Sequence, residues 1–317
     1  MPQVEVDVDE SLVRRLLRSL PDGWRDLRDA PIEHVATGWD NSVWRLGVSG
    51  ADSSGTEHGY AVRVPVRRVA AALILAAARW VGEVTGPIRE AGFRAPVPLH
   101  VADPGDLLPW PWCVVEWVPG TVLSAVPVVR RGPVADALAD ALPLLHRPAP
   151  PNAPINPGRG VTLAARRALT ERHLPAARDH LGTDVVSALL RLVDVAAALP
   201  AWPHPPVWCH GDLHAANLAL DEHGPADGRA LGFLDFDDLT SGDPAVDLRA
   251  LWLVLDPAQR ERARSALEAS GAYDEHVWTR AQGWAAASFL LPVAADPEGR
   301  VVFADSIEHA LEQLGCR

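Results

Sequence analysis

Two hydrophobic periodicities divide the chain near residue 119. Before that point, short apolar runs are bounded by Gly, Pro, Asn and Asp, which is typical of β-strands. Such runs lie at residues 32–36, 43–48, 60–66, 96–101 and 113–118. Helical spacing precedes them at 9–19 and interrupts them at 67–84. The pattern predicts five strands with one main helix among them.

Past residue 119, helical spacing dominates. It predicts helices at residues 132–146, 161–180, 183–199, 244–255, 258–270 and 274–292. A break at 204–240 holds short apolar strands at 207–209, near 218–221 and at 231–236. Polar loops at 50–57 and 221–229 join neighbouring strands, the second as a hairpin.

Pro119-Gly120 marks the boundary between these two parts. The sequence therefore predicts an α+β chain of two lobes. Residues 1–118 form a small N-terminal lobe with an antiparallel sheet and one main helix. Residues 119–317 form a larger, mostly helical C-terminal lobe.

Polar residues gather in the break between the helices. The loop 210–217 places Asp212 and Asn217 five positions apart, and Asp235 follows after two short strands. Phosphoryl transfer from ATP needs one carboxylate to orient a hydroxyl, and an amide oxygen and a second carboxylate to hold Mg²⁺. Any one of these residues alone would more often form a turn or a cap. As an ordered set they predict Asp212 as the catalytic base, with Asn217 and Asp235 as metal ligands.

These motifs resemble the aminoglycoside and macrolide phosphotransferase family, which are small-molecule kinases with a protein-kinase-like fold. Its markers are H-G-D-x-x-x-x-N at 210–217, a hydrophobic-Asp-Phe at 234–236, and G-D-P-x-x-D at 242–247. The resemblance spans roughly residues 30–300. It implies ATP or GTP as phosphate donor, Mg²⁺ as cofactor, and structural roles for Asp243 and Asp247. We expect His214 to be a hydrogen-bonded structural residue.

The resemblance also implies a nucleotide site in the N-terminal lobe. The turn between the first two strands offers Gly38, Asn41 and Ser42 as candidates for cradling phosphates. The segment before the lobe boundary offers backbone groups of Glu116 and Val118 for adenine. A plain hairpin is the alternative for the first segment.

The chain contains no lysine, so all 29 of its basic residues are arginine. The family's third strand carries a cation that contacts phosphate, and Arg63 occupies this position here. Arg can bind phosphate bidentately, but its side chain is longer and its guanidinium is planar, so it is not interchangeable with Lys. The usual partner is a helix Glu, yet Val69–Trp80 contains no acid and Ala77 stands where it is expected. Glu83 and Glu90, further along the chain, are the alternative partners for Arg63.

Composition limits the kinds of ligand and partner that the chain is expected to bind. The net charge of −12 disfavours nucleic-acid binding and suits a cationic acceptor, although solubility alone explains it equally well. Three scattered cysteines fit neither a zinc site nor a disulfide framework, and no signal segment or span-length apolar run is evident. We therefore expect a cytoplasmic protein with no membrane partner.

The leading hypothesis is an ATP- or GTP-dependent kinase that phosphorylates a small-molecule hydroxyl, with an aminoglycoside or macrolide antibiotic as acceptor. One alternative is a kinase of a choline-like or sugar metabolite. A second is a pseudokinase or binding module, motivated by Arg63 and the missing helix acid. A third is a hydrolytic metal centre at Asp212, His214 and Asp235.

Overall fold

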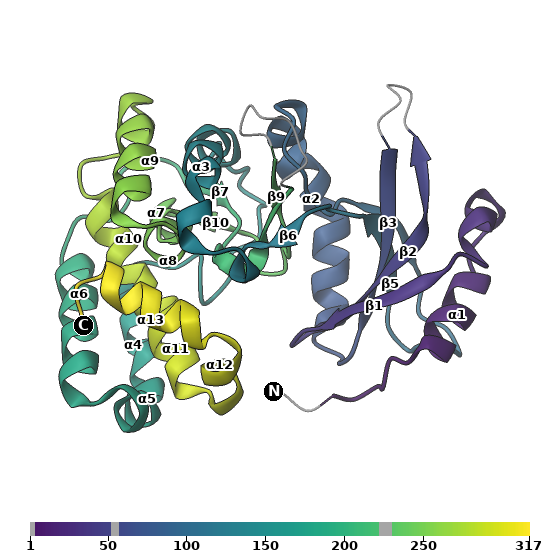
Figure 1. Cartoon of the computed structure of the whole chain (residues 1–317), viewed down its shortest axis with the longest axis horizontal. Helices are drawn as coiled ribbons and strands as arrows, with labels where there is room; N and C mark the ends of the chain where they lie inside the picture. The colour runs from purple at the N-terminus through teal and green to yellow at the C-terminus, as the bar shows by residue number, and fades with distance from the viewer. Residues whose placement is uncertain (1–3, 52–56, 222–229) are drawn as a thin grey trace. The chain divides into compact units, whose positions relative to one another are not determined.

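The computed structural model describes residues 4–51, 57–221 and 230–317. They form two compact units (Figure 1). The N-terminal unit comprises Met1–Arg89, Arg94–Pro119 and the later segment Phe233–Asp237, and the C-terminal unit comprises the rest. Most of the loop predicted at 50–57, and nearly all of the hairpin loop predicted at 221–229, lie outside the described residues.

An antiparallel sheet of five strands forms the N-terminal unit, as predicted. The strands are β1 (Ile32–Thr37), β2 (Asn41–Ala51), β3 (Glu57–Pro65), β4 (Pro98–Ala102) and β5 (Trp112–Glu116). Their order is β1-β2-β3-β5-β4. The register pairs Val43 with Arg63, and Arg63 with Cys113. Asn41 therefore lies diagonally across from Arg63 on the same face of the sheet.

A helix covers each face of this sheet (Figure 1). On one face, Val62, Val64 and Val114 pack with the apolar side of α1 (Glu10–Arg18), which Asp9 caps through Leu12 N. A 3₁₀ turn, η1 (Asp22–Leu27), follows α1. Successive strand residues point to opposite faces. Ala61, Arg63 and Cys113 consequently belong to the other face, beside α2 (Ala70–Glu90).

The helix α2 is longer than predicted. The pattern ends at residue 84 because Gly86 and Pro87 follow, yet the helix continues through Pro87 to Glu90. Among the described residues, α2 is the one helix that is long and apolar enough to cross a membrane, judged by length and composition alone, and 39% of its apolar window is buried. Its Ile74 packs on Ala61, Cys113 and Val115 of the sheet, as a core helix does.

The C-terminal unit is mainly helical. Its helices are α3 (Gly132–Leu145), α4 (Leu163–Thr170), α5 (Leu174–Leu181), α6 (Thr183–Ala197), α7 (Ala245–Leu248), α8 (Ala250–Val254), α9 (Pro257–Ala269), α10 (Val277–Ala285), α11 (Leu291–Ala295), α12 (Pro297–Val302) and α13 (Ala304–Gln313). Shorter 3₁₀ turns are η2 (Leu123–Ala125), η3 (Val128–Arg130), η4 (Glu171–His173) and η5 (Ala215–Asn217). A π-helical turn, η6 (Ala286–Leu290), joins α10 to α11.

Three long helical patterns are broken in the structure. The stretch predicted at 161–180 bends at η4, 244–255 divides into α7 and α8, and 274–292 contains η6. Local hydrogen bonding changes at these points without a change in hydrophobic spacing, which is why periodicity misses them. The sequence also gave no prediction for α12 and α13.

Short strands frame the polar loop of the C-terminal unit. β7 (Val207–Cys209) pairs with β10 (Thr240–Gly242), and β6 (Thr121–Val122), β8 (Leu218–Leu220) and β9 (Leu231–Phe233) form a second sheet. The strand predicted at 231–236 ends at Phe233. Asp235 has a φ of 54°, a left-handed conformation that no strand accommodates.

Candidate active site

The loop 210–217 leaves β7 through Gly211, whose φ is +87°. A Cβ atom on this residue would lie 2.2 Å from the carbonyl oxygen of Asp238. Both the backbone conformation and the lack of space therefore require glycine. This turn directs the next residue, Asp212, out of the strand.

Asp247 of α7 holds the loop backbone. Its fully buried carboxylate accepts hydrogen bonds from the N–H groups of His210 (2.7 Å) and Gly211 (2.8 Å). His146 Nε2 lies 3.2 Å away, and His146 Nδ1 lies 2.9 Å from the Tyr273 hydroxyl. Burial raises the pKa of Asp247, but His146, His210 and the Gly211 N–H together lower it below its usual range. The carboxylate therefore stays ionised and fixes the loop.

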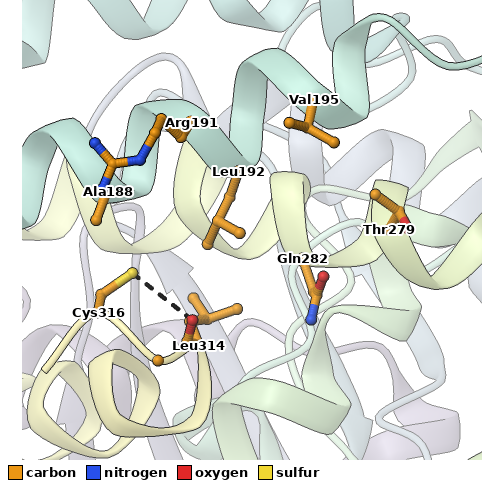
Figure 2. A pocket seen from close by; sticks show the side chains of 9 residues that line it. Ala188, Arg191, Leu192, Val195, Thr279, Gln282, Leu314 and Cys316 are labelled. Carbon is orange, nitrogen blue, oxygen red and sulfur yellow. Dashed lines mark hydrogen bonds between the residues drawn. The ribbon is translucent and has the colours of Figure 1, made fainter.

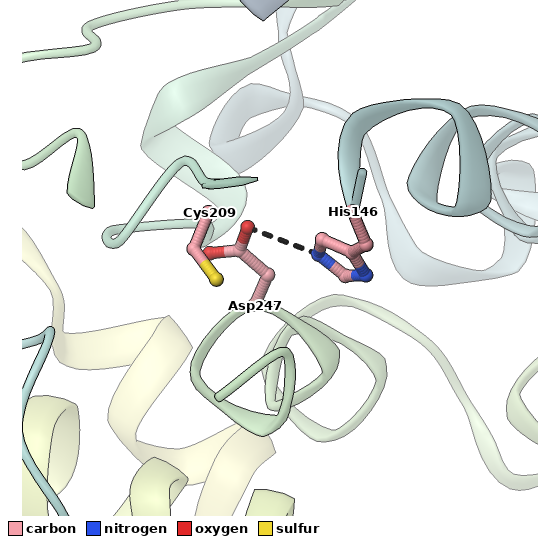
Figure 3. Close-up of side chains that lie close together, drawn as sticks. All are labelled: His146, Cys209 and Asp247. Carbon is pink, nitrogen blue, oxygen red and sulfur yellow. Dashed lines mark hydrogen bonds and ion pairs between the residues drawn. The ribbon is translucent and has the colours of Figure 1, made fainter. Parts of the chain in front are cut away.

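Asp247, His146 and Cys209 also form the group of metal-ligand side chains found among the described residues (Figure 3). Their ligand atoms lie within 4.8 Å of one another. Hydrogen bonds already use the carboxylate and the imidazole, and burial raises the pKa of the Cys209 thiol well above its usual value. The group is better described as a buried network that supports the loop than as a metal centre.

Three cationic or polar groups surround Asp212. Its Oδ1 accepts hydrogen bonds from Arg249 (2.6 Å) and Arg159 (3.0 Å), and its Oδ2 lies 3.3 Å from His214 Nε2. Burial raises the pKa of Asp212, but Arg159, His214 and Arg249 outweigh burial and hold that pKa well below its usual range. The carboxylate is therefore ionised, a weak base, and fixed in orientation.

Sequence reasoning missed the arginines around Asp212. Arg159 donates to the carbonyl of Ser288 and Arg166 to that of Ala287, both in the π-helical turn η6. Such turns leave carbonyl groups without their usual helical partner. The arginines satisfy these carbonyls, and Arg159 links the turn to Asp212. Burial, together with Arg159 and Arg249, lowers the pKa of Arg166 to about 9.

Asn217 lies in the same unit as Asp212 and is oriented by it. Its Nδ2 donates to the backbone carbonyl of Asp212 at 2.9 Å. With the amide nitrogen engaged in this way, the side-chain oxygen Oδ1 points away from that bond. A neutral oxygen with a fixed direction is a suitable ligand for Mg²⁺.

Asp243 is structural, in line with its place in the motif. Its carboxylate binds Arg280, whose Nε lies 2.6 Å from Oδ2, and Arg280 also pairs with Asp274. Arg280 is 2% exposed and Asp243 Oδ1 accepts from Ala245 N at the start of α7. The network anchors α10 to the segment that precedes Asp247.

The third motif residue, Asp235, belongs to the N-terminal unit. Its Oδ1 lies 3.3 Å from Arg63 Nη2, and its side chain is 51% exposed. Arg63 Nη2 also contacts Asp237 Oδ2 at 2.9 Å, and Asn41 Nδ2 donates to that same oxygen at 2.9 Å. Asn41 Oδ1 and Asp237 Oδ1 are buried without a hydrogen-bond partner. The cluster thus retains unused acceptor oxygens.

The other predicted nucleotide residues lie in the same unit as Asp235. Gly38 N donates to Asn41 O at 2.9 Å and closes the turn between β1 and β2. The Ser42 hydroxyl is fully buried and accepts from Thr37 Oγ1 and Trp44 Nε1. Internal contacts therefore occupy the Ser42 hydroxyl.

At the end of β5, the Glu116 carboxylate accepts two hydrogen bonds from Arg89 of α2, at 2.6 and 2.8 Å. Its backbone N–H donates to Val97 O. The described residues provide no hydrogen bond to the N–H or C=O of Val118. The Glu116 N–H is thus already used within the unit, and Val118 is 5% exposed.

The structure accordingly brings the predicted residues together in two sets. Asp212 and Asn217 are adjacent in the C-terminal unit, whereas Arg63, Asn41 and Asp235 cluster in the N-terminal unit. A separate pocket of about 260 Å³ in the C-terminal unit contains none of them. It lies between α6, α10 and residues 314–316 (Figure 2).

Comparison with known proteins gives a family for this arrangement. The family model described as the phosphotransferase enzyme family matches residues 31–290. No curated protein matches by sequence.

Several solved structures share the fold. A point mutant of aminoglycoside 2′-phosphotransferase-IIIa in complex with GDP has a TM-score of 0.66 and 16% identity, and the match covers 97% of this chain and 96% of that one. Macrolide 2′-phosphotransferase MphH from Brachybacterium faecium has a TM-score of 0.59 and 16% identity, with 98% of each chain covered. An APH(2″)-IIIa complex with GDP and kanamycin has a TM-score of 0.58 and 15% identity, with 90% and 92% covered.

The family match spans most of the chain, and the α+β fold agrees with that of these solved structures. The prediction of fold class and family is confirmed. The chain belongs to the phosphotransferase enzyme family and is a phosphotransferase of the kinase class.

Proposed function

We propose that this enzyme transfers the γ-phosphate of ATP or GTP to a hydroxyl group of a small molecule, with an aminoglycoside or macrolide antibiotic as the acceptor. The observation that carries this proposal is the fixed pair of Asp212 and Asn217 in the loop 210–217. Family membership supports the reaction class. The solved structures that share the fold include enzymes in complex with GDP, kanamycin and streptomycin.

Asp212 acts as the catalytic base. The acceptor hydroxyl oxygen attacks the γ-phosphorus, the bond from that phosphorus to the bridging oxygen breaks, and the hydroxyl proton passes to Asp212. Because Arg159 and Arg249 keep its pKa low, Asp212 contributes more by orienting the hydroxyl than by basicity. A loose transition state requires little base strength.

Asn217 and Asp235 hold the metal ion in this proposal. When bound, Mg²⁺ neutralises phosphate charge and orients the phosphates. The donor set fits a hard cation: Asn217 presents an oriented amide oxygen, and Asp235 a half-exposed carboxylate. Buried oxygens of Asn41 and Asp237 without a donor further support a cation or water beside Asp235.

The N-terminal unit binds the nucleotide. Backbone groups of Glu116 and Val118 receive the base, and the turn that contains Gly38, Asn41 and Ser42 faces the phosphates. Arg63 supplies the cation that contacts them. Since internal contacts occupy the Ser42 hydroxyl, the backbone of this turn is the more suitable phosphate ligand.

Local charge bears on the acceptor. The chain is acidic overall, but Arg159 and Arg249 flank Asp212 and Arg166 lies behind them. Because Asp212 and Asp238 pair with these arginines, the local charge is largely compensated and is compatible with an aminoglycoside as well as with a macrolide. A choline-like or sugar metabolite remains the alternative acceptor class.

A phosphate-transfer screen tests the proposal. Purified enzyme with MgCl₂ and either ATP or GTP is offered aminoglycosides, macrolides, amino-alcohols and sugars, and products are identified by mass spectrometry. The Asp212→Asn variant is the matched control. Transfer to one acceptor class by wild type alone is the expected result. No transfer to any class, together with no Mg²⁺-dependent stabilisation by nucleotide in a thermal-shift titration, would overturn it.

The same proposal places the enzyme in the cytoplasm, with no nucleic-acid or membrane partner. Its cysteines are all free thiols, which suits a reducing compartment. The acidic net charge disfavours a phosphate backbone as ligand.

A further inference from the structure

We propose that Asp237 is the positioning residue for Arg63, in place of the helix acid that this chain lacks, and that Asn41 holds Asp237 in register. This inference rests on the proposed function, because it assigns the device that aims the phosphate-binding cation. Two consecutive strands, β2 and β3, and the distant segment Phe233–Asp237 supply the group.

Arg63 needs a fixed countercharge. It is 6% exposed and lies on the sheet face that α2 covers, beside Ala61 and Cys113. A buried guanidinium is costly unless an acid and hydrogen bonds compensate it. Its long side chain also has several rotatable bonds, so the position of the guanidinium depends on its partner.

The helix α2 does not supply that partner. Its buried side chains are apolar or small and include Ile74, Ala77 and Trp80, whereas its acids Glu83 and Glu90 lie at exposed positions. The ion pairs of Arg63 within the described residues are instead those with Asp235 and Asp237.

Of these two acids, Asp237 is the better positioned. Its side chain is 12% exposed and lies 2.9 Å from Arg63 Nη2, compared with 51% and 3.3 Å for Asp235. A hydrogen bond from Asn41 Nδ2 holds the oxygen that Arg63 contacts. Asn41 shares the sheet face of Arg63, one diagonal away, so register alone brings the two side chains to the same carboxylate.

The arrangement divides two tasks between neighbouring acids. Asp237 fixes Arg63, which leaves the more exposed Asp235 for the cation in the proposed function. In the absence of Asp237, Arg63 would pair with Asp235 alone and compete with the metal for it. Loss of Asp237 should therefore weaken binding of the nucleotide's phosphates without changing binding of its base.

Calorimetric binding of ATP and of adenosine, each with MgCl₂, tests this inference. Adenosine lacks phosphates, so it reports on the base site alone. We expect Asp237→Asn to raise the Kd for ATP by about 30-fold, the lower end of the effect of removing one partner of a buried charge pair. The Kd for adenosine should change less than about 2-fold.

Two further variants separate positioning from general structural damage. Asp237→Glu keeps the charge but displaces the carboxylate, and should give an intermediate rise for ATP only. In an Arg63→Gln background, adding Asp237→Asn should cause no further rise, because the group that Asp237 positions is already absent. As a matched control, Asp22→Asn removes the acid of the exposed Arg28–Asp22 pair and should leave both Kd values unchanged.

The outcomes distinguish the inference from the function on which it rests. Equal losses for ATP and adenosine, additive effects in the double variant, or wild-type ATP binding in Asp237→Asn would each overturn the positioning role. If Asp237→Asn does not fold, Asp237→Glu and the Arg63→Gln series decide the question. Wild-type enzyme that binds ATP no more tightly than adenosine would instead count against the kinase proposal itself.

Discussion

Replacement of Asp247 by alanine removes the acceptor that holds the loop 210–217 in place. In the wild-type protein this carboxylate is fully buried and receives the N–H groups of His210 and Gly211 at 2.7 and 2.8 Å. Alanine offers no acceptor. Both donors would then be left buried without a partner, and His146 would lose its contact at 3.2 Å.

The expected cost follows from these contacts. A hydrogen bond to a charged group contributes roughly 1.5–3 kcal/mol, so two of them amount to about 3–6 kcal/mol. Water that enters the space left by the carboxylate would partly satisfy the two N–H groups, so we expect a cost in the lower half of this range, about 3–4 kcal/mol. The exposed pair Asp136–Arg262 gives a matched control, since Asp136→Ala should cost less than about 1 kcal/mol.

Hydrogen exchange measures this cost locally. The amides of His210 and Gly211 should exchange about 100- to 1,000-fold faster in Asp247→Ala, since each 1.4 kcal/mol corresponds to a factor of ten. Global stability is followed by chemical denaturation at the same pH. Exchange at these two amides that matches wild type, with a stability change no larger than in Asp136→Ala, would refute the reasoning.

The pH dependence of the same comparison has a defined sign. The folded-state pKa of Asp247 lies below its unfolded value of about 3.9. Its contribution to stability is therefore complete above that value and is lost as pH falls through the folded pKa. The stability difference between wild type and Asp247→Ala should be constant at neutral pH and shrink in acid.

Three further substitutions test other parts of the site. Asp212→Asn should lower kcat by about 10²–10⁴ while the Kd for ATP stays near wild type, measured by steady-state kinetics and calorimetry, and turnover near wild type would rule out a catalytic role. Gly211→Ala forces a side chain into a left-handed turn that has no space for it, so the Tm from thermal denaturation and the kcat should both fall. A fully active variant would contradict the geometry. Arg280→Gln leaves the acids Asp243 and Asp274 unpaired, and we expect denaturation to show a loss of about 3–5 kcal/mol; a smaller loss than about 1 kcal/mol would disprove the pairing.

The sequence was sufficient for the fold class because two signals agreed. Alternation before residue 119 and helical spacing after it predicted the sheet and the helical region, and the motif spacing around Asp212 indicated the family. Long elements with strong periodicity are the most predictable because burial of one face determines both the pattern and the structure. The breaks at η4 and η6 have no such signal.

The arginines around Asp212 could not be predicted from spacing. Arg159 precedes Asp212 by 53 residues and Arg249 follows it by 37, and neither belongs to a motif. Their contact depends on how the π-helical turn and the loop pack, which is a tertiary property. One signal was present: an arginine directly after the apolar Leu248, at a position that proves fully buried, requires an acidic or carbonyl partner.

Asp237 is a second residue whose contact could not be predicted from the sequence. The sequence indicated that Arg63 lacks its helix partner, but it could not identify a substitute 174 residues away. Only the register of β2 and β3, together with the return of Phe233–Asp237 to the N-terminal unit, brings the carboxylate to it.

That return has a practical consequence for dissection of the protein into fragments. A polypeptide that stops at Pro119 omits the segment Phe233–Asp237, although the segment belongs to the same compact unit. Such a fragment would bury the guanidinium of Arg63 with neither of its acids. We expect this fragment to be poorly soluble alone and its solubility to recover when a synthetic peptide that spans 230–238 is added. The N-terminal unit is therefore compact in space but is built from segments that are not continuous in the sequence.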